Sequence, residues 1–287
     1  MKKLFLFGIG VFLVADLLLF LLLFYRDGRT KEAEPYDESR SIADLLLLAK
    51  EPLGQTMYIW GGGWNKEDTG AGEETRSLGL SPMWKKFADR QDGAYDYQKT
   101  RYQIHDGLDC SGYIGWVVYN LMETRNGEAG YVTLASEMAT DFSDRGFGEF
   151  TEAGEVSDWM AGDIMSMEGH VWMVLGSCED GSVVLIHSSP PGVRLCGTRL
   201  PGDRGQAGER EASAGKVSEA ERLAEKYMRK YYPDWYERYP RADCDYRYLT
   251  DSSCMRWSSE VLADEEGLRK MSAEGVLQWL FDLGNKR

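Results

Sequence analysis

A cysteine stands where the chain passes from a polar stretch into an apolar run with helical spacing. Gly107-Leu108-Asp109-Cys110-Ser111-Gly112 leads into a segment ending near Met122, whose apolar residues recur on one helix face. A thiol at a helix N-terminus lies at the positive end of the helix dipole, which favours the thiolate. We therefore predict that Cys110 is a pre-ionised nucleophile whose pKa a neighbouring imidazolium lowers further. A buried structural cysteine is the alternative interpretation.

Two histidines lie on a segment with the pattern of a β-hairpin. Residues 170–176 and 182–187 are short β-like runs separated by a polar turn, and His170 and His187 stand at their outer ends. If the loop centres on Cys178-Glu179, the histidines lie directly opposite each other, with Cβ atoms about 5 Å apart. His187 would then orient the ring of His170 while His170 faces the thiol, as in a catalytic triad. A tight turn at Asp180-Gly181 would separate them instead.

Several motifs follow one another along the chain: Tyr58-Ile59-Trp60-Gly61-Gly62, Asp109-Cys110-Ser111-Gly112, Gly162-Asp163-Ile164, His170-Val171 and His187. This ordered set resembles the NlpC-type cell-wall cysteine peptidases, over residues 41–63 and 107–196. The resemblance implies an α+β, papain-like fold, with the nucleophile at a helix N-terminus packed on an antiparallel sheet. It also implies a cysteine endopeptidase that hydrolyses amide bonds in peptidoglycan stem peptides.

Carried onto this sequence, the resemblance makes Cys110 the nucleophile, His170 the general base and His187 the orienting third residue. Positions that contact substrate in the family are matched by Tyr58, Asp109 and Ser111. Tyr58 would also stabilise the oxyanion together with the Cys110 backbone N–H. The alternatives are core packing for Tyr58 and helix capping for Asp109. Because a thiol and an imidazole suffice for amide hydrolysis, we predict neither a metal ion nor an organic cofactor.

Residues 64–106 form an insertion between the Gly-Gly motif and the Asp-Cys-Ser-Gly motif, which the family usually joins by a far shorter connection. A long connection inside a domain tends to be functional, here as a lid or a recognition surface. The insertion also carries His105, which is close to Cys110 in sequence and is an alternative base.

Helix-capping residues mark the elements that surround the motifs. Ser41, Ser218 with Glu221, and Ser272 each precede a run with helical apolar spacing. We predict a catalytic domain over residues 41–197 and a C-terminal helical extension over residues 198–287 that packs on it.

The N-terminal segment is apolar from Leu4 to Phe24, long enough to cross a bilayer as one helix. Asp16 in its middle costs about 3 kcal/mol, which the surrounding apolar residues outweigh. We predict a transmembrane anchor over residues 1–25 and a polar stalk over residues 26–40; a cleaved signal peptide is the alternative. The implied function places the catalytic domain on the extracytoplasmic side of the cell membrane. The expected partners are that membrane and peptidoglycan stem peptides.

The net charge and the cysteine content bear on which classes of protein this chain can belong to. The chain has 33 Lys and Arg against 47 Asp and Glu, a net charge of -14, which argues against binding nucleic acid. Its five cysteines fit one free thiol plus up to two disulfides outside the cell. The nearest-neighbour pairings are Cys178 with Cys196 and Cys244 with Cys254, although spacing alone selects none. The absence of C-x-x-C spacing argues against structural zinc.

Three other functions are compatible with the same residues. An amidase that cuts the sugar–peptide link and an acyltransferase that passes the acyl group to an amine would use the same thioester chemistry. A non-catalytic module that binds wall peptides is a third alternative, which loss of the cysteine or the histidine would have favoured.

Overall fold

The computed structural model describes residues 40–71, 79–122, 129–200 and 216–283. The predicted anchor over residues 1–25 and the stalk up to residue 39 lie outside this part of the chain. Within it, no helix combines the length and the apolar character needed to cross a membrane. Arg40 begins the unit that holds both the expected catalytic domain and the expected extension.

Seven strands of the described residues form one mixed sheet in the order β1-β7-β2-β3-β4-β5-β6. Neighbouring strands are antiparallel except β5 and β6, which are parallel. The α+β prediction is therefore confirmed, whereas a purely antiparallel sheet is wrong at this edge. The strands are β1 (Gly148–Thr151), β2 (Ile164–Met167), β3 (His170–Ser177), β4 (Val183–Ser189), β5 (Gly192–Thr198), β6 (Asp243–Cys244) and β7 (Ser253–Trp257).

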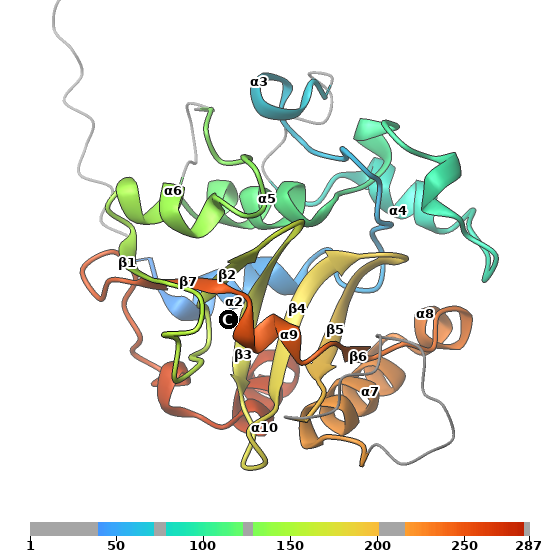
Figure 1. Ribbon diagram of the computed structural model, residues 1–287. Helices are drawn as coiled ribbons and strands as arrows, with labels where there is room; N and C mark the ends of the chain where they lie inside the picture. The colour runs from blue at the N-terminus through green and yellow to red at the C-terminus, as the bar shows by residue number, and fades with distance from the viewer. Residues whose placement is uncertain (1–39, 72–78, 123–128, 201–215, 284–287) are drawn as a thin grey trace, which may run out of the picture. The chain divides into compact units, whose positions relative to one another are not determined.

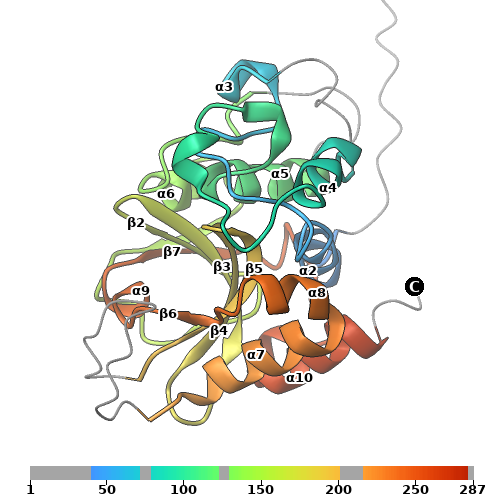
Figure 2. The same ribbon diagram turned by 90° about the vertical axis from the view of Figure 1, so that its right-hand side faces the viewer.

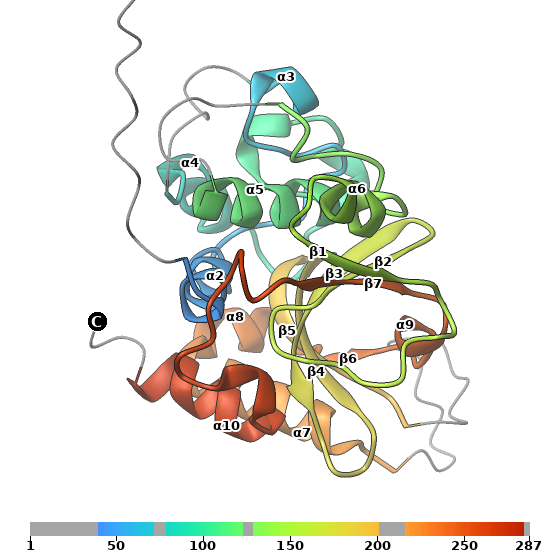
Figure 3. The ribbon, with the colours of Figure 1, turned by 90° about the vertical axis from the view of Figure 1, so that its left-hand side faces the viewer.

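Helices cover both faces of this sheet (Figures 1 to 3). Helices α2, α4, α5, α6, α7, α8 and α10 contribute to one core with one face of the sheet, and α9 packs on the opposite face. The α-helices are α2 (Ile42–Lys50), α3 (Lys66–Thr69), α4 (Pro82–Ala88), α5 (Cys110–Met122), α6 (Met138–Asp144), α7 (Glu219–Tyr231), α8 (Pro233–Arg238), α9 (Arg247–Thr250) and α10 (Ala273–Gln278). Shorter turns are the 3₁₀ helices η2 (Tyr97–Lys99), η3 (Ile104–Asp106) and η4 (Leu268–Lys270), and η5 (Trp279–Leu283), a π-helical turn that continues α10.

The predicted capping residues begin the predicted helices. Ser41 forms a capping box with Asp44 at α2, and Ser218 forms one with Glu221 at α7. The Ser272 hydroxyl accepts the backbone N–H of Gly275 at α10. These side chains satisfy N–H groups that a helix start leaves without a partner, so local sequence fixes where each helix begins.

Side chains of the sheet alternate between two cores. Along β3, Val171 and Met173 face the helices α2 and α5, whereas Trp172 and Val174 belong to the second core. Because successive side chains of a strand point to opposite faces, His170 projects on the same side as Trp172. The strand therefore carries its histidine toward the face that α9 covers.

The C-terminal segment contains strands as well as helices, which differs from the expected helical extension. Its strand β7 inserts between β1 and β2, and its strand β6 extends the other edge beside β5. Met255 and Trp257 of β7 pack in the first core, and Cys254 packs in the second. A five-residue strand of this kind gives a weak local signal, because its partners are far away in sequence.

All five cysteines are free thiols, so neither of the nearest-neighbour disulfides is formed. Cys178 lies at the turn between β3 and β4 and is half-buried. Its expected partner, Cys196, is buried in the second core with Cys244 and Cys254. The pairing of Cys178 with Cys196 therefore does not match the fold.

A buried ion pair joins the inserted strand β7 to the start of β2. Asp163 is 1% exposed, and Arg256 of β7 donates to it with Nη2 at 2.6 Å from Oδ2. Burial raises the pKa of Asp163, and the Arg256 guanidinium opposes that rise. Removal of the arginine would leave a buried carboxylate without its counter-charge.

We predict that Arg256→Met lowers the free energy of unfolding by about 3 kcal/mol or more. The matched control is Lys226→Met, which removes an exposed ion pair with Glu274 at 3.0 Å and should cost less than about 1 kcal/mol. Urea denaturation of both variants measures the difference. Equal, small losses in the two variants would contradict this account of β7.

Candidate active site

Asp109 fixes the start of the nucleophile helix. Its Oδ1 accepts the backbone N–H of Gly112 at 2.7 Å and the hydroxyl of Ser111 at 3.0 Å. Its Oδ2 accepts the backbone N–H of Gly61 at 3.1 Å. The capping interpretation of Asp109 is thus correct, and the same carboxylate ties α5 to the turn that follows Tyr58.

Glycine is required where this turn meets the helix. A Cβ atom built on Gly112 would lie 2.3 Å from the carbonyl oxygen of Gly62, a distance that no side chain tolerates. The carbonyl of Gly62 also accepts the backbone N–H of Asp109 at 3.1 Å. The two motifs therefore pack backbone against backbone, which explains the glycines in both.

Cys110 is the first residue of α5 and is 7% exposed. The backbone N–H of Val171 hydrogen-bonds to the Cys110 thiol, which places Cys110 beside the start of β3. Burial, followed by the Asp109 carboxylate, raises the pKa of Cys110 to about 12. The prediction of a pre-ionised thiolate is therefore wrong for the unliganded protein, because loss of solvent outweighs the helix dipole.

His170 and His187 form a hydrogen-bonded pair. His170 Nε2 lies 2.9 Å from His187 Nδ1, and the rings meet edge to face with centroids 5.0 Å apart. Burial, aided by the Arg194 cation, lowers the pKa of His170 to about 3 and that of His187 well below its usual range. Both imidazoles are therefore neutral near neutral pH, and the predicted contact between them is confirmed.

The predicted register of the hairpin is wrong, because Ser177 pairs with Val183 and the loop therefore centres on Asp180 and not on Cys178-Glu179. Met173 pairs with Ile186, whereas Gly176 pairs with Val184, so a bulge lies between Val174 and Gly176. The same register carried to the strand ends places His170 diagonal to His187 and not directly opposite. The pair still forms because both rings project from one face of the sheet and bridge the diagonal.

Tyr248 of α9 covers the histidine pair. Its ring centroid lies 5.3 Å from that of His170 and 6.0 Å from that of His187. Its phenol also interacts electrostatically with the Cys110 thiol. Sequence reasoning missed this residue, because a tyrosine-rich segment far along the chain gives no sign of which ring reaches the site.

Tyr58 lies between the thiol and the insertion. The side chain is 7% exposed, yet no described residue hydrogen-bonds to its hydroxyl. Its ring meets Tyr97 of the insertion edge to face at 5.5 Å. Burial raises the pKa of Tyr58, followed by the nearby Cys110 and Asp109, whereas Arg101 of the insertion opposes the rise. The insertion therefore contributes to the surroundings of the nucleophile.

The other predicted site residues have different positions. Ser111 follows the thiol and donates its hydroxyl to Asp109, so it supports the cap. His105 is exposed on η3, and its Nε2 lies 3.6 Å from the neighbouring Asp106. His105 thus contacts that carboxylate, whereas His170 precedes Val171, whose backbone N–H hydrogen-bonds to the Cys110 thiol. His170 is thus the better-placed base.

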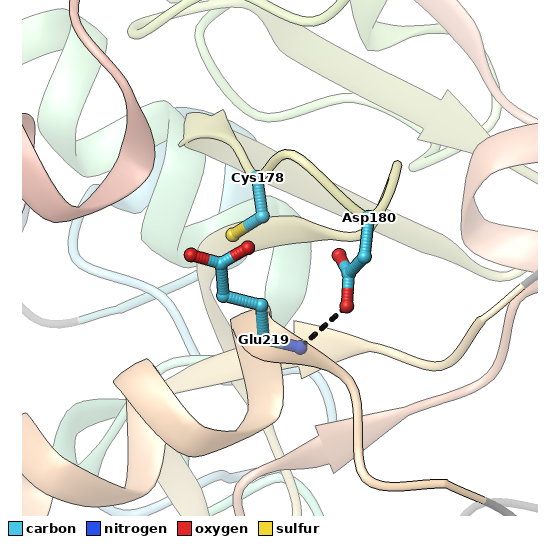
Figure 4. Close-up of side chains that lie close together, drawn as sticks. All are labelled: Cys178, Asp180 and Glu219. Atoms are coloured by element: carbon cyan, nitrogen blue, oxygen red, sulfur yellow. Dashed lines mark hydrogen bonds between the residues drawn. The ribbon is translucent and has the colours of Figure 1, made fainter.

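One group of residues within the described ranges has the chemistry of a cation site. Cys178, Asp180 and Glu219 gather where the β3–β4 turn meets the start of α7 (Figure 4). Asp180 Oδ2 accepts the backbone N–H of Glu219 at 2.7 Å, so this carboxylate caps the helix. The group lies at the end of β3 opposite to His170, and capping accounts for it.

Within the described residues no hydrogen bond joins the Cys110 thiol to the His170 ring; the thiol meets the backbone N–H of Val171, the residue after His170. Together with the hydrogen bond between His170 and His187, this placement suits transfer of a proton from a thiol to an imidazole that a second imidazole orients. The Tyr58 phenol interacts electrostatically with the Cys110 thiol, and its hydroxyl is a donor suited to a developing negative charge. No family model, curated protein or solved structure matches this chain.

We predict that the rate of Cys110 alkylation by iodoacetamide rises about tenfold per pH unit between pH 6 and 9, because only the thiolate reacts and its pKa lies above this range. Peptide mass spectrometry of the labelled full-length chain measures the rate at this cysteine alone. The urea-unfolded chain is the control, and its rate should level off near the ordinary thiol pKa. A plateau from pH 6 upward in the folded protein would contradict a neutral thiol.

Proposed function

We propose that this chain is a membrane-anchored, extracytoplasmic cysteine peptidase of papain-like fold that hydrolyses amide bonds in peptidoglycan stem peptides. The observation that carries the proposal is the hydrogen-bonded pair of His170 and His187, together with the hydrogen bond from the N–H of Val171, the residue after His170, to the Cys110 thiol. The NlpC-like order of motifs supplies the substrate class, and the apolar residues 4–24 supply the anchor.

In the acylation step, His170 takes the proton of the Cys110 thiol as the sulfur attacks the carbonyl carbon of the scissile amide. Because the thiol and the imidazole are both neutral at rest, proton transfer accompanies attack and does not precede it. The negative charge that develops on the carbonyl oxygen meets the Cys110 N–H and the Tyr58 hydroxyl. The C–N bond then breaks, and the leaving amine takes the proton from His170.

In the deacylation step, water replaces the amine. His170 removes a proton from the water molecule, the hydroxide attacks the thioester, and the proton returns to the departing Cys110 sulfur. His187 holds the His170 ring through both steps, because its Nδ1 is hydrogen-bonded to Nε2 of His170 and leaves the other ring nitrogen of His170 to act as the base. Each protein group thus ends in the state in which it began.

We predict that the full-length protein releases peptide fragments from purified peptidoglycan, and that Cys110→Ala and His170→Ala lower the rate by about a thousandfold or more. Mass spectrometry of the released fragments measures the rate and names the bond that is cut. Sugar-linked products would indicate the amidase alternative, and amine-capped products the acyltransferase.

The matched control is Cys178→Ala, which removes a free thiol at the far end of β3 and should leave activity unchanged. No fragment release by the parent protein, with binding to the wall retained, would contradict the proposal and favour a non-catalytic module.

A further inference from the structure

A cavity of about 320 Å³ lies where the insertion meets the C-terminal segment. Three stretches far apart in the sequence line it: the insertion with Tyr95 and Tyr97, the turn between β4 and β5 with Pro190 and Pro191, and the end of α8 and the residues after it with Arg238 and Arg241. The insertion and the C-terminal segment both lie outside the residues that carry the NlpC resemblance. The cavity is therefore built largely from what this chain adds to that pattern.

Two hydrogen bonds hold these additions together beside the cavity. Arg238 Nη1 donates to the carbonyl oxygen of Gln91 at 2.9 Å, and the Tyr239 hydroxyl donates to that of Asp92 at 2.8 Å. Each bond joins residues 147 positions apart in the chain. The walls of the cavity are thus fixed by direct contacts between the insertion and the C-terminal segment.

The arginines of the cavity carry positive charge that the surrounding residues compensate incompletely. The Nε of Arg241 is buried, and no described residue hydrogen-bonds to it. Its acidic neighbour is Asp243, whose Oδ1 lies 3.8 Å away, whereas Oδ2 of the same carboxylate accepts from the buried Arg199 at 2.9 Å. The side-chain hydrogen bonds of Arg238 to described residues go to carbonyl oxygens. A buried donor without an acceptor is costly.

The lining of the cavity selects an anion. No acidic side chain of the described residues lines it, although the chain as a whole has a net charge of -14. A guanidinium presents parallel N–H groups whose geometry matches the two oxygens of a carboxylate. The cavity therefore suits a ligand that brings a carboxylate to Arg238 and Arg241.

The cavity adjoins the surroundings of the nucleophile. Its wall residue Tyr97 meets the ring of Tyr58 edge to face, and its wall residue Pro191 accepts the backbone N–H of Tyr58 at 2.8 Å. Tyr58 in turn interacts with the Cys110 thiol. Because an extended peptide spans about 3.5 Å per residue, a group a few residues from the scissile bond can reach the cavity.

We propose that this cavity binds the C-terminal carboxylate of the peptide substrate, with Arg241 and Arg238 as its cationic partners. The site selects stem peptides whose C-terminus is free, and it holds them so that an amide bond a few residues away lies at Cys110. This inference rests on the proposed function for the identity of the peptide.

The direct test is calorimetric binding of a synthetic stem peptide to full-length Cys110→Ala, with the peptide either as the free acid or as the C-terminal amide. The free acid should bind about tenfold to a hundredfold more tightly than the amide. Adding Arg241→Gln should abolish this preference. The matched control is Arg229→Gln, which removes an exposed arginine of α7 that pairs with Glu225 at 2.7 Å and should keep the preference intact.

Affinity for the amide is the folding check, because Arg241→Gln should leave it unchanged; if that variant fails the check, Arg238→Gln is judged in the same way. Equal affinity for the acid and the amide, or a preference that survives the arginine substitution, would overturn the inference. Inorganic phosphate is the competing anion. If phosphate binds to the Cys110→Ala protein more tightly than the free-acid peptide does, the cavity is a phosphate site and the inference fails.

The kinetic test uses the active full-length protein on the same two peptides. Amidation should raise KM by about tenfold to a hundredfold with kcat little changed, and it should have no further effect in Arg241→Gln. Cleavage of both peptides with equal KM would refute the carboxylate site and leave the proposed function standing. A protein that prefers the free acid in binding but cleaves neither peptide would refute the proposed function and leave the site standing.

Discussion

The close approach of the Gly62 carbonyl to Gly112 is the contact on which the site depends. It leaves room for no side chain, and the Asp109 carboxylate closes the junction by accepting from both segments. This junction sets the thiol at the first turn of α5 against Tyr58 on one side and the start of β3 on the other. Without it, Cys110 would have no fixed relation to the histidine pair.

Burial then determines how the groups at this junction ionise. The thiol, both imidazoles and the Tyr58 phenol lie where charge is poorly solvated, so each favours its neutral form. In the proposed mechanism, a charge appears only when a substrate carbonyl is present to receive it. Arg194 is the exception, a cation held inside the sheet, and its charge helps to lower the pKa of both imidazoles.

The parts of this structure that sequence could predict are the local ones. Caps at Ser41, Ser218 and Ser272, the helix that begins at Cys110 and the hairpin of β3 and β4 all depend on residues close together in the chain. The contact of the histidines was predictable from the hairpin, although the loop centres on Asp180 and not on Cys178-Glu179.

The remaining features depend on distant residues. Strand β7 pairs with β1 and β2 across about a hundred residues, and Tyr248 reaches the site only because that pairing brings α9 over the sheet. The contact between Cys196 and His187 depends on strand register and on burial, and the spacing of cysteines in the sequence reveals neither. The ionisation of Cys110 was mispredicted because helix position was visible in the sequence and depth of burial was not.

Trapping of the acyl-enzyme tests the central claim most directly. The full-length protein would be mixed with a purified stem peptide, quenched in acid within one turnover and analysed by intact and peptide mass spectrometry. The account predicts a thioester on Cys110 whose mass equals that of the acyl portion of the cleaved peptide, absent in Cys110→Ser and lost on treatment with hydroxylamine. Cleavage of the peptide without any adduct on Cys110, or an adduct on another residue, would contradict it.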